Sequence, residues 1–162
     1  MIRAAMAGML ALALAGCATT PEVPAHPEAR LYSASADAGA DVDAALARAA
    51  VNGKRVLLVM GANWCHDSRA LAGWLETPRF AALAYEIVYI DVGVPQTGAG
   101  RNLDIPRRFG LAEMQGTPAL LVLTPEGRAV NLDSAATWRN AASRSEEAIH
   151  TELAALAGRP AP

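Results

Sequence analysis

The residues best suited to chemistry stand together in the segment Trp64-Cys65-His66-Asp67-Ser68, which follows a short apolar run and opens a stretch of helical periodicity. A cysteine at the start of a helix can be a reactive thiolate, because free backbone N–H groups and the positive end of the helix dipole stabilise a charged sulfur. A protonated His66 would add to this effect, and Asp67 would oppose it. The Ser68 hydroxyl, one turn further on, could donate a hydrogen bond to the sulfur. We therefore expect nucleophilic thiol chemistry at Cys65, assisted by His66 and Ser68.

Two other interpretations of Cys65 are open. A lone cysteine is commonly an inert, buried side chain. A metal site on Cys65 and His66 would need further ligands, because two adjacent residues do not complete a tetrahedral set. The remaining histidines, His26 and His150, are expected on the surface. We accordingly predict no metal and no cofactor.

The N-terminus has the pattern of an export signal. Residues 1–3 supply a basic start, and residues 4–15 are apolar but too few to span a bilayer comfortably. The sequence Leu-Ala-Gly-Cys over residues 14–17 resembles the lipobox of bacterial lipoproteins, in which the cysteine is acylated and becomes the new N-terminus. We interpret residues 1–16 as a lipoprotein signal peptide and Cys17 as the lipidated residue. An ordinary secretory signal with a cysteine near its cleavage site is the alternative.

Residues 17–40 are rich in Ala, Pro, Thr, Ser and Glu, a composition typical of a tether between membrane and domain. Within this tether, Leu31-Tyr32 could dock on the domain. A lipoprotein with this layout would face the periplasm in the envelope of a Gram-negative bacterium. Ala18 is not the aspartate associated with retention in the inner membrane, which favours the outer membrane. Cys65 would then be the single thiol of the mature chain.

The bulk composition excludes some partners. The chain has 162 residues, of which 52% are apolar, and this suffices for one domain over residues 41–162. The net charge is −2 and becomes −3 when Arg3 is removed with the signal. No basic patch is present, so nucleic acid is not an expected partner.

Periodicity and turn residues predict an α/β domain. The expected elements are helices over 42–51 with Asp41 as N-cap, over 69–76, near 104–110 and from the capping box Ser143-x-x-Glu146 to about 156, and strands over 55–60, 86–92, 119–123 and 128–131. Residues 93–100 are expected to form a loop. The first two strands are joined through a helix, and the last two should form a hairpin. This order predicts a mixed central sheet of about four strands with helices on both faces.

Two segments resemble the thioredoxin-like superfamily. Residues 61–68 are similar to its strand-to-helix turn, with Trp64 before the nucleophile, and residues 116–123 look like the loop and strand that carry a cis-proline. The resemblance implies that Thr117 and Pro118 lie beside Cys65 and that, with Trp64, they bind substrate. Read alone, the second segment could simply begin a strand with a proline.

Three departures from the family pattern limit the reactions that Cys65 can carry out. Ser68 replaces the second, resolving cysteine of the usual Cys-x-x-Cys pair, Val59 replaces a buried acid, and Gly61 replaces a tryptophan. A serine hydroxyl cannot release a mixed disulfide, so exchange at Cys65 would have to follow a monothiol route.

The leading hypothesis is a membrane-anchored periplasmic protein that exchanges disulfides through Cys65. Its expected partners are thiols and disulfides of envelope proteins, or small thiols such as glutathione. One alternative is a non-catalytic module that binds an extended peptide in the groove beside Pro118. Another is a sensor that is reversibly oxidised at Cys65.

Overall fold

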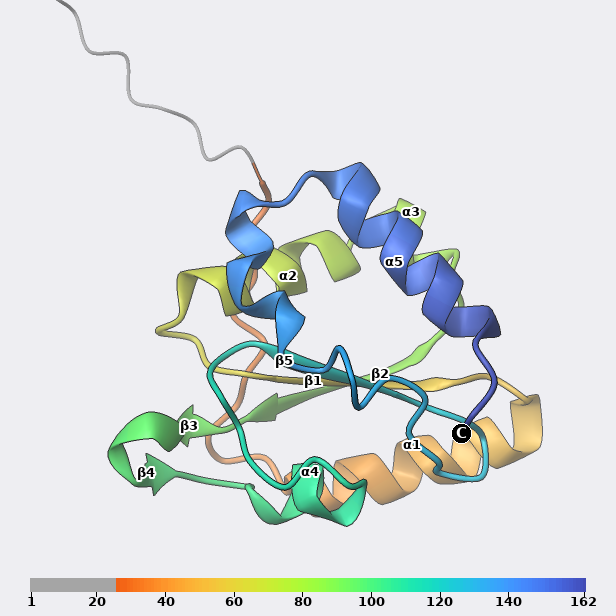
Figure 1. Cartoon of the computed structure of the whole chain (residues 1–162), viewed down its shortest axis with the longest axis horizontal. Helices are drawn as coiled ribbons and strands as arrows, with labels where there is room; N and C mark the ends of the chain where they lie inside the picture. Colours follow the sequence, from red (N-terminus) through yellow and green to blue (C-terminus); the bar gives the residue numbers. More distant parts are fainter. Residues whose placement is uncertain (1–25) are drawn as a thin grey trace, which may run out of the picture.

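The computed structural model describes residues 26–162, so the predicted signal peptide and Cys17 lie outside the described residues. In chain order the elements are helix α1 (Ala38–Asn52), strand β1 (Val56–Gly61), helices α2 (His66–Leu75) and α3 (Pro78–Ala81), strands β2 (Glu86–Asp91) and β3 (Gly93–Val94), 3-10 helix η1 (Pro95–Thr97), strand β4 (Ala99–Gly100), helix α4 (Asp104–Arg108), strand β5 (Ala119–Leu123), 3-10 helix η2 (Thr137–Ser143) and helix α5 (Glu146–Gly158) (Figure 1). None of the helices among these residues is long and apolar enough to cross a membrane.

The central sheet has the strand order β2-β1-β5, with β1 parallel to β2 and antiparallel to β5. Helices α1 and α4 lie on one side of it, and α2, α5 and η2 lie on the other (Figure 1). Every residue of β1 and β5 is buried, as expected for strands covered on both faces. Alternate residues of β1 therefore enter two different cores: Leu58 packs with Val42 of α1, and Leu57 with Leu71 of α2. The predicted α/β class with a mixed sheet between helices is confirmed.

The predicted fourth strand over residues 128–131 is not formed as a strand. An isolated bridge joins Leu123 to Ala129, and Val130 N donates to Val122 O at 2.9 Å. Beyond the bridge, the side chain of Asn131 takes the place of a neighbouring backbone: its Oδ1 accepts from Val122 N at 2.8 Å, and its Nδ2 donates to Leu120 O at 3.0 Å. The main sheet thus has three strands. At Val122 N and Leu120 O a carboxamide makes the hydrogen bonds that the backbone of a hairpin partner would otherwise make.

The segment predicted as a loop over residues 93–100 forms a small hairpin. Strands β3 and β4 pair antiparallel around η1, with Gly93 opposite Gly100. This hairpin projects beyond the carboxyl end of β2, next to α4 (Figure 1).

Two helices begin at other residues than predicted. Helix α1 starts at Ala38, where Asp37 rather than Asp41 is the N-cap and accepts from Ala40 N at 3.0 Å. Helix α5 is capped by Ser145 rather than Ser143. In both cases a neighbouring residue of equal capping ability was available, and sequence spacing alone does not choose between them.

The described part of the predicted tether is packed onto the domain. Tyr32 is only 2% exposed, and its hydroxyl donates to Ser68 O at 3.0 Å. The side chain of Asn63 donates to the backbone carbonyl of Tyr32 and accepts from its N–H, at 2.8 and 3.2 Å. The Ala29 N–H donates to Arg69 O of α2. Contacts with the domain therefore run from about residue 27 to Tyr32, whereas residues 33–37 are exposed, and α1 begins before residue 41.

Gly73 in the middle of α2 lets this segment approach the helix. A Cβ at position 73 would overlap the carbonyl group of Pro27 and would stand 2.7 Å from Glu28 N. We expect Gly73→Ala to push the segment off α2 and to cost about 1–3 kcal/mol of unfolding free energy, although alanine favours the helix itself. Hydrogen exchange at the Ala29 amide should become faster.

Gly158→Ala is the matched control, since a Cβ there meets no atom within 4 Å. This variant should leave both stability and the exchange at Ala29 unchanged within error. Equal protection of Ala29 in Gly73→Ala and in the natural chain would contradict the close packing.

Candidate functional site

Cys65 stands at the junction between β1 and α2. It is the N-cap of α2, with extended backbone angles of φ −82° and ψ 122°, and its carbonyl accepts from Arg69 N at 3.1 Å. Its own N–H donates to Ala62 O, which closes the turn. The thiol therefore lies at the positive end of the helix, as predicted. The residue is 8% exposed, so only a small part of it can be reached from solvent.

The thiol of Cys65 faces the loop that precedes β5. Its Sγ donates to Thr117 O at 3.4 Å, and the Thr117–Pro118 peptide bond is cis. The sheet explains this contact: β1 and β5 are antiparallel with Met60 opposite Ala119, so the end of one strand meets the start of the other. The structure thus brings Thr117 and Pro118 beside Cys65.

Ser68 lies in the position of a resolving residue but makes no hydrogen bond to the sulfur. It is fully buried, and its Oγ has no hydrogen-bond partner among residues 26–162. The expected hydrogen bond from Ser68 to Cys65 is therefore wrong, because the thiol is directed to Thr117 instead. This leaves an unpaired hydroxyl inside the protein, one helical turn after the nucleophile.

Gly61 makes the room in which Ser68 and Tyr32 meet. A Cβ at position 61 would stand 2.6 Å from Tyr32 Cε1 and 2.7 Å from Ser68 Oγ. Burial raises the pKa of the Tyr32 hydroxyl well above its ordinary value, and the nearby charge of an ionised Cys65 adds to the rise. The hydroxyl therefore stays protonated and remains a donor to Ser68 O. The large ring that the family places at position 61 is replaced here by a tyrosine from a distant segment.

His66 and Asp67 point away from the sulfur. His66 Nε2 lies 3.1 Å from Glu28 Oε1, and the imidazole is more than half exposed. Asp67 accepts from Ala142 N at 2.9 Å and so ties α2 to η2. Asp67 thus has a structural partner, and the imidazole of His66 is paired with a carboxylate that the sequence did not indicate.

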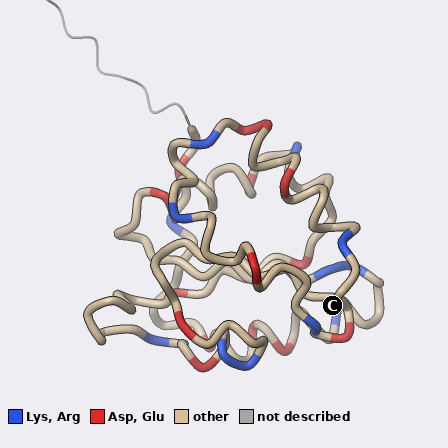
Figure 2. Tube along the Cα trace, in the orientation of Figure 1, with Lys and Arg blue, Asp and Glu red and all other residues tan. Residues whose placement is uncertain are grey.

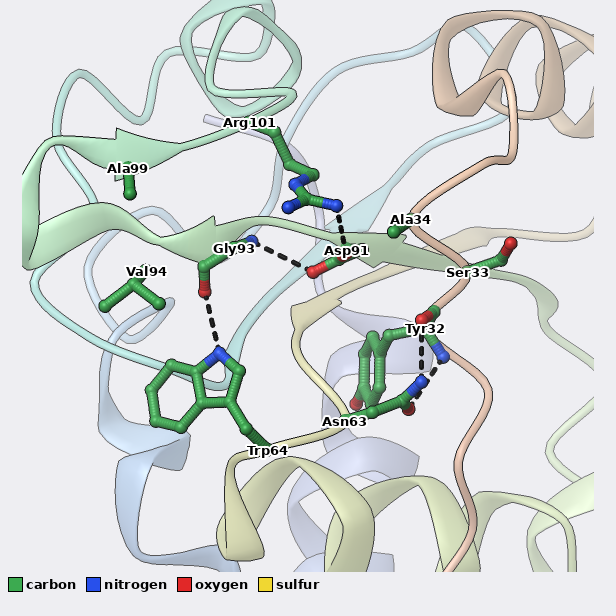
Figure 3. Close-up of a pocket in the computed structure, with 10 residues that line it drawn as sticks. All are labelled: Tyr32, Ser33, Ala34, Asn63, Trp64, Asp91, Gly93, Val94, Ala99 and Arg101. Carbon is green, nitrogen blue, oxygen red and sulfur yellow. Dashed lines mark hydrogen bonds and ion pairs between the residues drawn. The ribbon is translucent and has the colours of Figure 1, made fainter.

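Trp64 forms one wall of a pocket of about 470 Å³ next to the nucleophile (Figure 3). The indole is 55% exposed, and its Nε1 donates to Gly93 O at 3.1 Å. Tyr32 and Asn63 line another side, and residues of the β3–β4 hairpin complete the lining. A large aromatic ring held at the surface by one hydrogen bond offers apolar area to a partner.

Asp91 lies at the back of this pocket, where its carboxylate accepts from Gly93 N at 2.9 Å and pairs with Arg101 at 3.1 Å (Figure 3). Sequence reasoning missed both charged residues. The available signal was an acid at the end of a buried strand, since ligand-binding groups in α/β proteins gather at the carboxyl ends of parallel strands.

Elsewhere, acidic and basic residues are interspersed along the trace (Figure 2). Several of them form surface ion pairs, such as Arg48 with Glu86 at 2.7 Å and Arg159 with Asp133 at 2.7 Å. Positive and negative side chains are present in similar numbers, which gives the small net charge of −2.

The fold and the Cys65–Thr117 arrangement are those of a thioredoxin-like domain. Residues 37–125 match the family model described as thioredoxin-like, and the chain belongs to this family. It is similar to the crystal structure of a disulphide isomerase from Xylella fastidiosa Temecula1, with 35% sequence identity and a TM-score of 0.70 over 78% of this chain and 96% of that chain. A protein of unknown function from Pseudomonas aeruginosa shows 17% identity and a TM-score of 0.43 over 75% of this chain and 84% of that chain. A search of curated proteins returned no match.

Proposed function

We propose that this protein exchanges thiols and disulfides through Cys65 alone. The observation that carries the proposal is the position of Cys65 Sγ, which lies at the N-terminus of α2 and 3.4 Å from Thr117 O, beside Pro118. Ser68, not a second cysteine, follows one turn later. Within the described residues Cys65 is the single cysteine.

The family and its named neighbour support the broader part of this proposal. A thioredoxin-like domain and 35% identity to a protein named disulphide isomerase support a thiol–disulfide oxidoreductase-like function. The monothiol route is the narrower part, and it depends on Ser68.

The exchange begins when the Cys65 thiolate attacks one sulfur of a substrate disulfide. The substrate S–S bond breaks, a Cys65–substrate disulfide forms, and the other substrate sulfur leaves as a thiolate. Ser68 cannot attack this mixed disulfide. A second thiolate on the substrate, or an external thiol such as glutathione, then attacks the substrate sulfur and releases Cys65. The first case rearranges disulfides with no net oxidation. In the second case the external thiol becomes disulfide-bonded to the substrate, and a second external thiol must attack that bond to complete the reduction, with the two external thiols leaving as one disulfide.

The loop at Thr117 and the ring of Trp64 would hold the substrate. An extended peptide beside Pro118 could pair with the backbone of Thr117, as strands do when they add to a sheet edge. The carbonyl of Thr117 is engaged by the thiol in the free protein. Trp64 would cover apolar side chains next to the reacting sulfur.

The location of this chemistry is also part of the proposal. Cys17 as a lipid-bearing N-terminus would hold the domain on a membrane of the Gram-negative envelope, facing the periplasm, with the outer membrane favoured by Ala18. Its partners would then be envelope protein disulfides and small thiols, in a compartment where disulfides persist.

Trapping of mixed disulfides tests the proposal. The natural chain, expressed in cells and treated with mild oxidant before alkylation, should yield envelope adducts that reducing agent releases. The purified chain should gain one glutathione per molecule from glutathione disulfide, measured as intact mass. Cys65→Ala should abolish both signals, and Cys17→Ser should keep the glutathione adduct.

Three outcomes separate this proposal from its alternatives. Absence of any Cys65-dependent adduct contradicts it. Partner capture that survives Cys65→Ala but fails when Trp64 is replaced indicates a binding module. Adducts with glutathione alone, with none from proteins, indicate a sensor.

A further inference from the structure

Folding brings three metal-ligating residues together outside the thiol site. His26, Glu28 and His66 each offer one ligand atom, and these atoms all lie within 4.8 Å of one another. The rings of His26 and His66 have centroids 4.9 Å apart, and His66 Nε2 is 3.1 Å from Glu28 Oε1. Along the sequence, Cys65 and His66 have no nearby ligand that could complete a metal site. Docking of the N-terminal segment onto α2 supplies two further ligands, His26 and Glu28.

We propose that His26, Glu28 and His66 form a binding site for a divalent transition-metal ion, with zinc as its best-suited occupant. Two imidazole nitrogens and one carboxylate oxygen are a donor set that zinc sites use when the fourth position holds water. Imidazole also favours copper and nickel, whereas calcium and magnesium prefer oxygen ligands.

The geometry needs only a small closure of side chains. Ligand atoms around a tetrahedral zinc ion are about 3.4 Å apart, given metal–ligand bonds of about 2.0–2.1 Å. The separation of His66 and Glu28 is already 3.1 Å. Both of these side chains are at least partly exposed, so rotation of their terminal groups can bring the three atoms to bonding distance without moving the backbone.

Neighbouring groups orient the ligands. Arg69 Nε donates to Glu28 Oε2 at 2.8 Å, which leaves Oε1 on the side of His66. His26 Nδ1 lies 3.3 Å from Pro27 O, and an N–H there would donate to the carbonyl and leave Nε2 free for a metal.

A bound ion would connect two parts of the fold. His26 and Glu28 belong to the segment that precedes α1, whereas His66 is the first residue of α2. The ion would clamp that segment to the helix that carries Cys65. Metal binding should therefore raise the thermal stability of the protein, since it favours the folded state.

The test uses the tag-free full chain, so that no added histidines contribute. Calorimetric titration with zinc should show saturable binding of one equivalent, and the melting temperature should rise. His26→Ala and His66→Ala should each weaken binding at least about tenfold, and Glu28→Gln should do so while keeping the side-chain shape. His150→Ala is the matched control, because His150 packs on Phe80 away from the site, and it should bind as the natural chain does.

A second background separates this site from thiol chemistry. The Cys17→Ser, Cys65→Ser variant has no thiol and should bind zinc as well as the natural chain. Loss of binding in that variant would assign the metal to thiolates and overturn the proposal. So would the absence of saturable binding below about 1 mM zinc, or equal binding in the His26→Ala, His66→Ala double variant. Because thiol exchange is absent from this background, the result is independent of the proposed function.

Discussion

Ser68→Cys should convert the proposed monothiol exchange at Cys65 into dithiol reduction of the substrate. The new thiol stands one helical turn after Cys65, in the spacing of a Cys-x-x-Cys pair. It would attack Cys65 Sγ in the mixed disulfide, release the substrate thiolate, and leave a disulfide between residues 65 and 68. Well-oriented intramolecular reactions have effective concentrations far above those of external thiols. Release of substrate should therefore be faster by about 100-fold or more.

Stopped-flow release of a fluorescent thiol from the purified mixed disulfide measures this effect. Ser68→Ala is the control, since it removes the hydroxyl without adding a thiol and should release no faster than the natural chain. Ser68 is buried with an unpaired Oγ, so neither change removes a hydrogen bond seen among the described residues. Equal release in Ser68→Cys and Ser68→Ala would show that position 68 cannot reach the sulfur.

Asn131→Ala should cause a large loss of stability, although Asn131 lies outside the thiol site. Asn131 is fully buried, and its carboxamide is the partner of both Val122 N and Leu120 O. Removal leaves two buried backbone groups without partners, at about 1–3 kcal/mol each. We expect the free energy of unfolding to fall by roughly 2–5 kcal/mol, measured by urea denaturation with an unchanged m-value.

Asn140→Ala is the matched control, because Asn140 is exposed on η2. Its effect should stay within about 0.5 kcal/mol. If the two variants unfold at the same urea concentration, the edge of β5 must obtain its hydrogen bonds in another way.

Asn131 also shows why one strand was predicted wrongly. The turn at Pro125 and the apolar residues after it are typical of a hairpin, and the chain does return alongside β5. The local sequence pattern predicts that the chain returns beside β5. It does not tell whether backbone groups or a side chain will make the hydrogen bonds to β5. The three strands of the main sheet were predicted correctly, because continuous apolar runs are a strong signal for buried strands.

At the thiol site, the two motifs could be predicted from the sequence, but several side-chain contacts could not. The two motifs place Cys65 beside Thr117 because adjacent antiparallel strands bring their opposite ends together. The direction of the thiol was not predictable: Cys65 Sγ donates to the Thr117 carbonyl and not to Ser68. Nor was the partner of His66, which pairs with Glu28 and not with the sulfur. Such contacts depend on side-chain rotamers and on which polar groups find hydrogen-bond partners when they are buried.

By itself, the sequence determined the thioredoxin-like class, the place of Cys65 at the start of a helix and the serine in the resolving position. These features follow from local periodicity, capping and identity at single positions. Only the tertiary structure decided that Tyr32 fills the space left by Gly61, and that His26 and Glu28 meet His66. The physical reason is that these contacts join segments some 30 to 40 residues apart, where packing of the docked N-terminal segment against α2, not local preference, selects the partners.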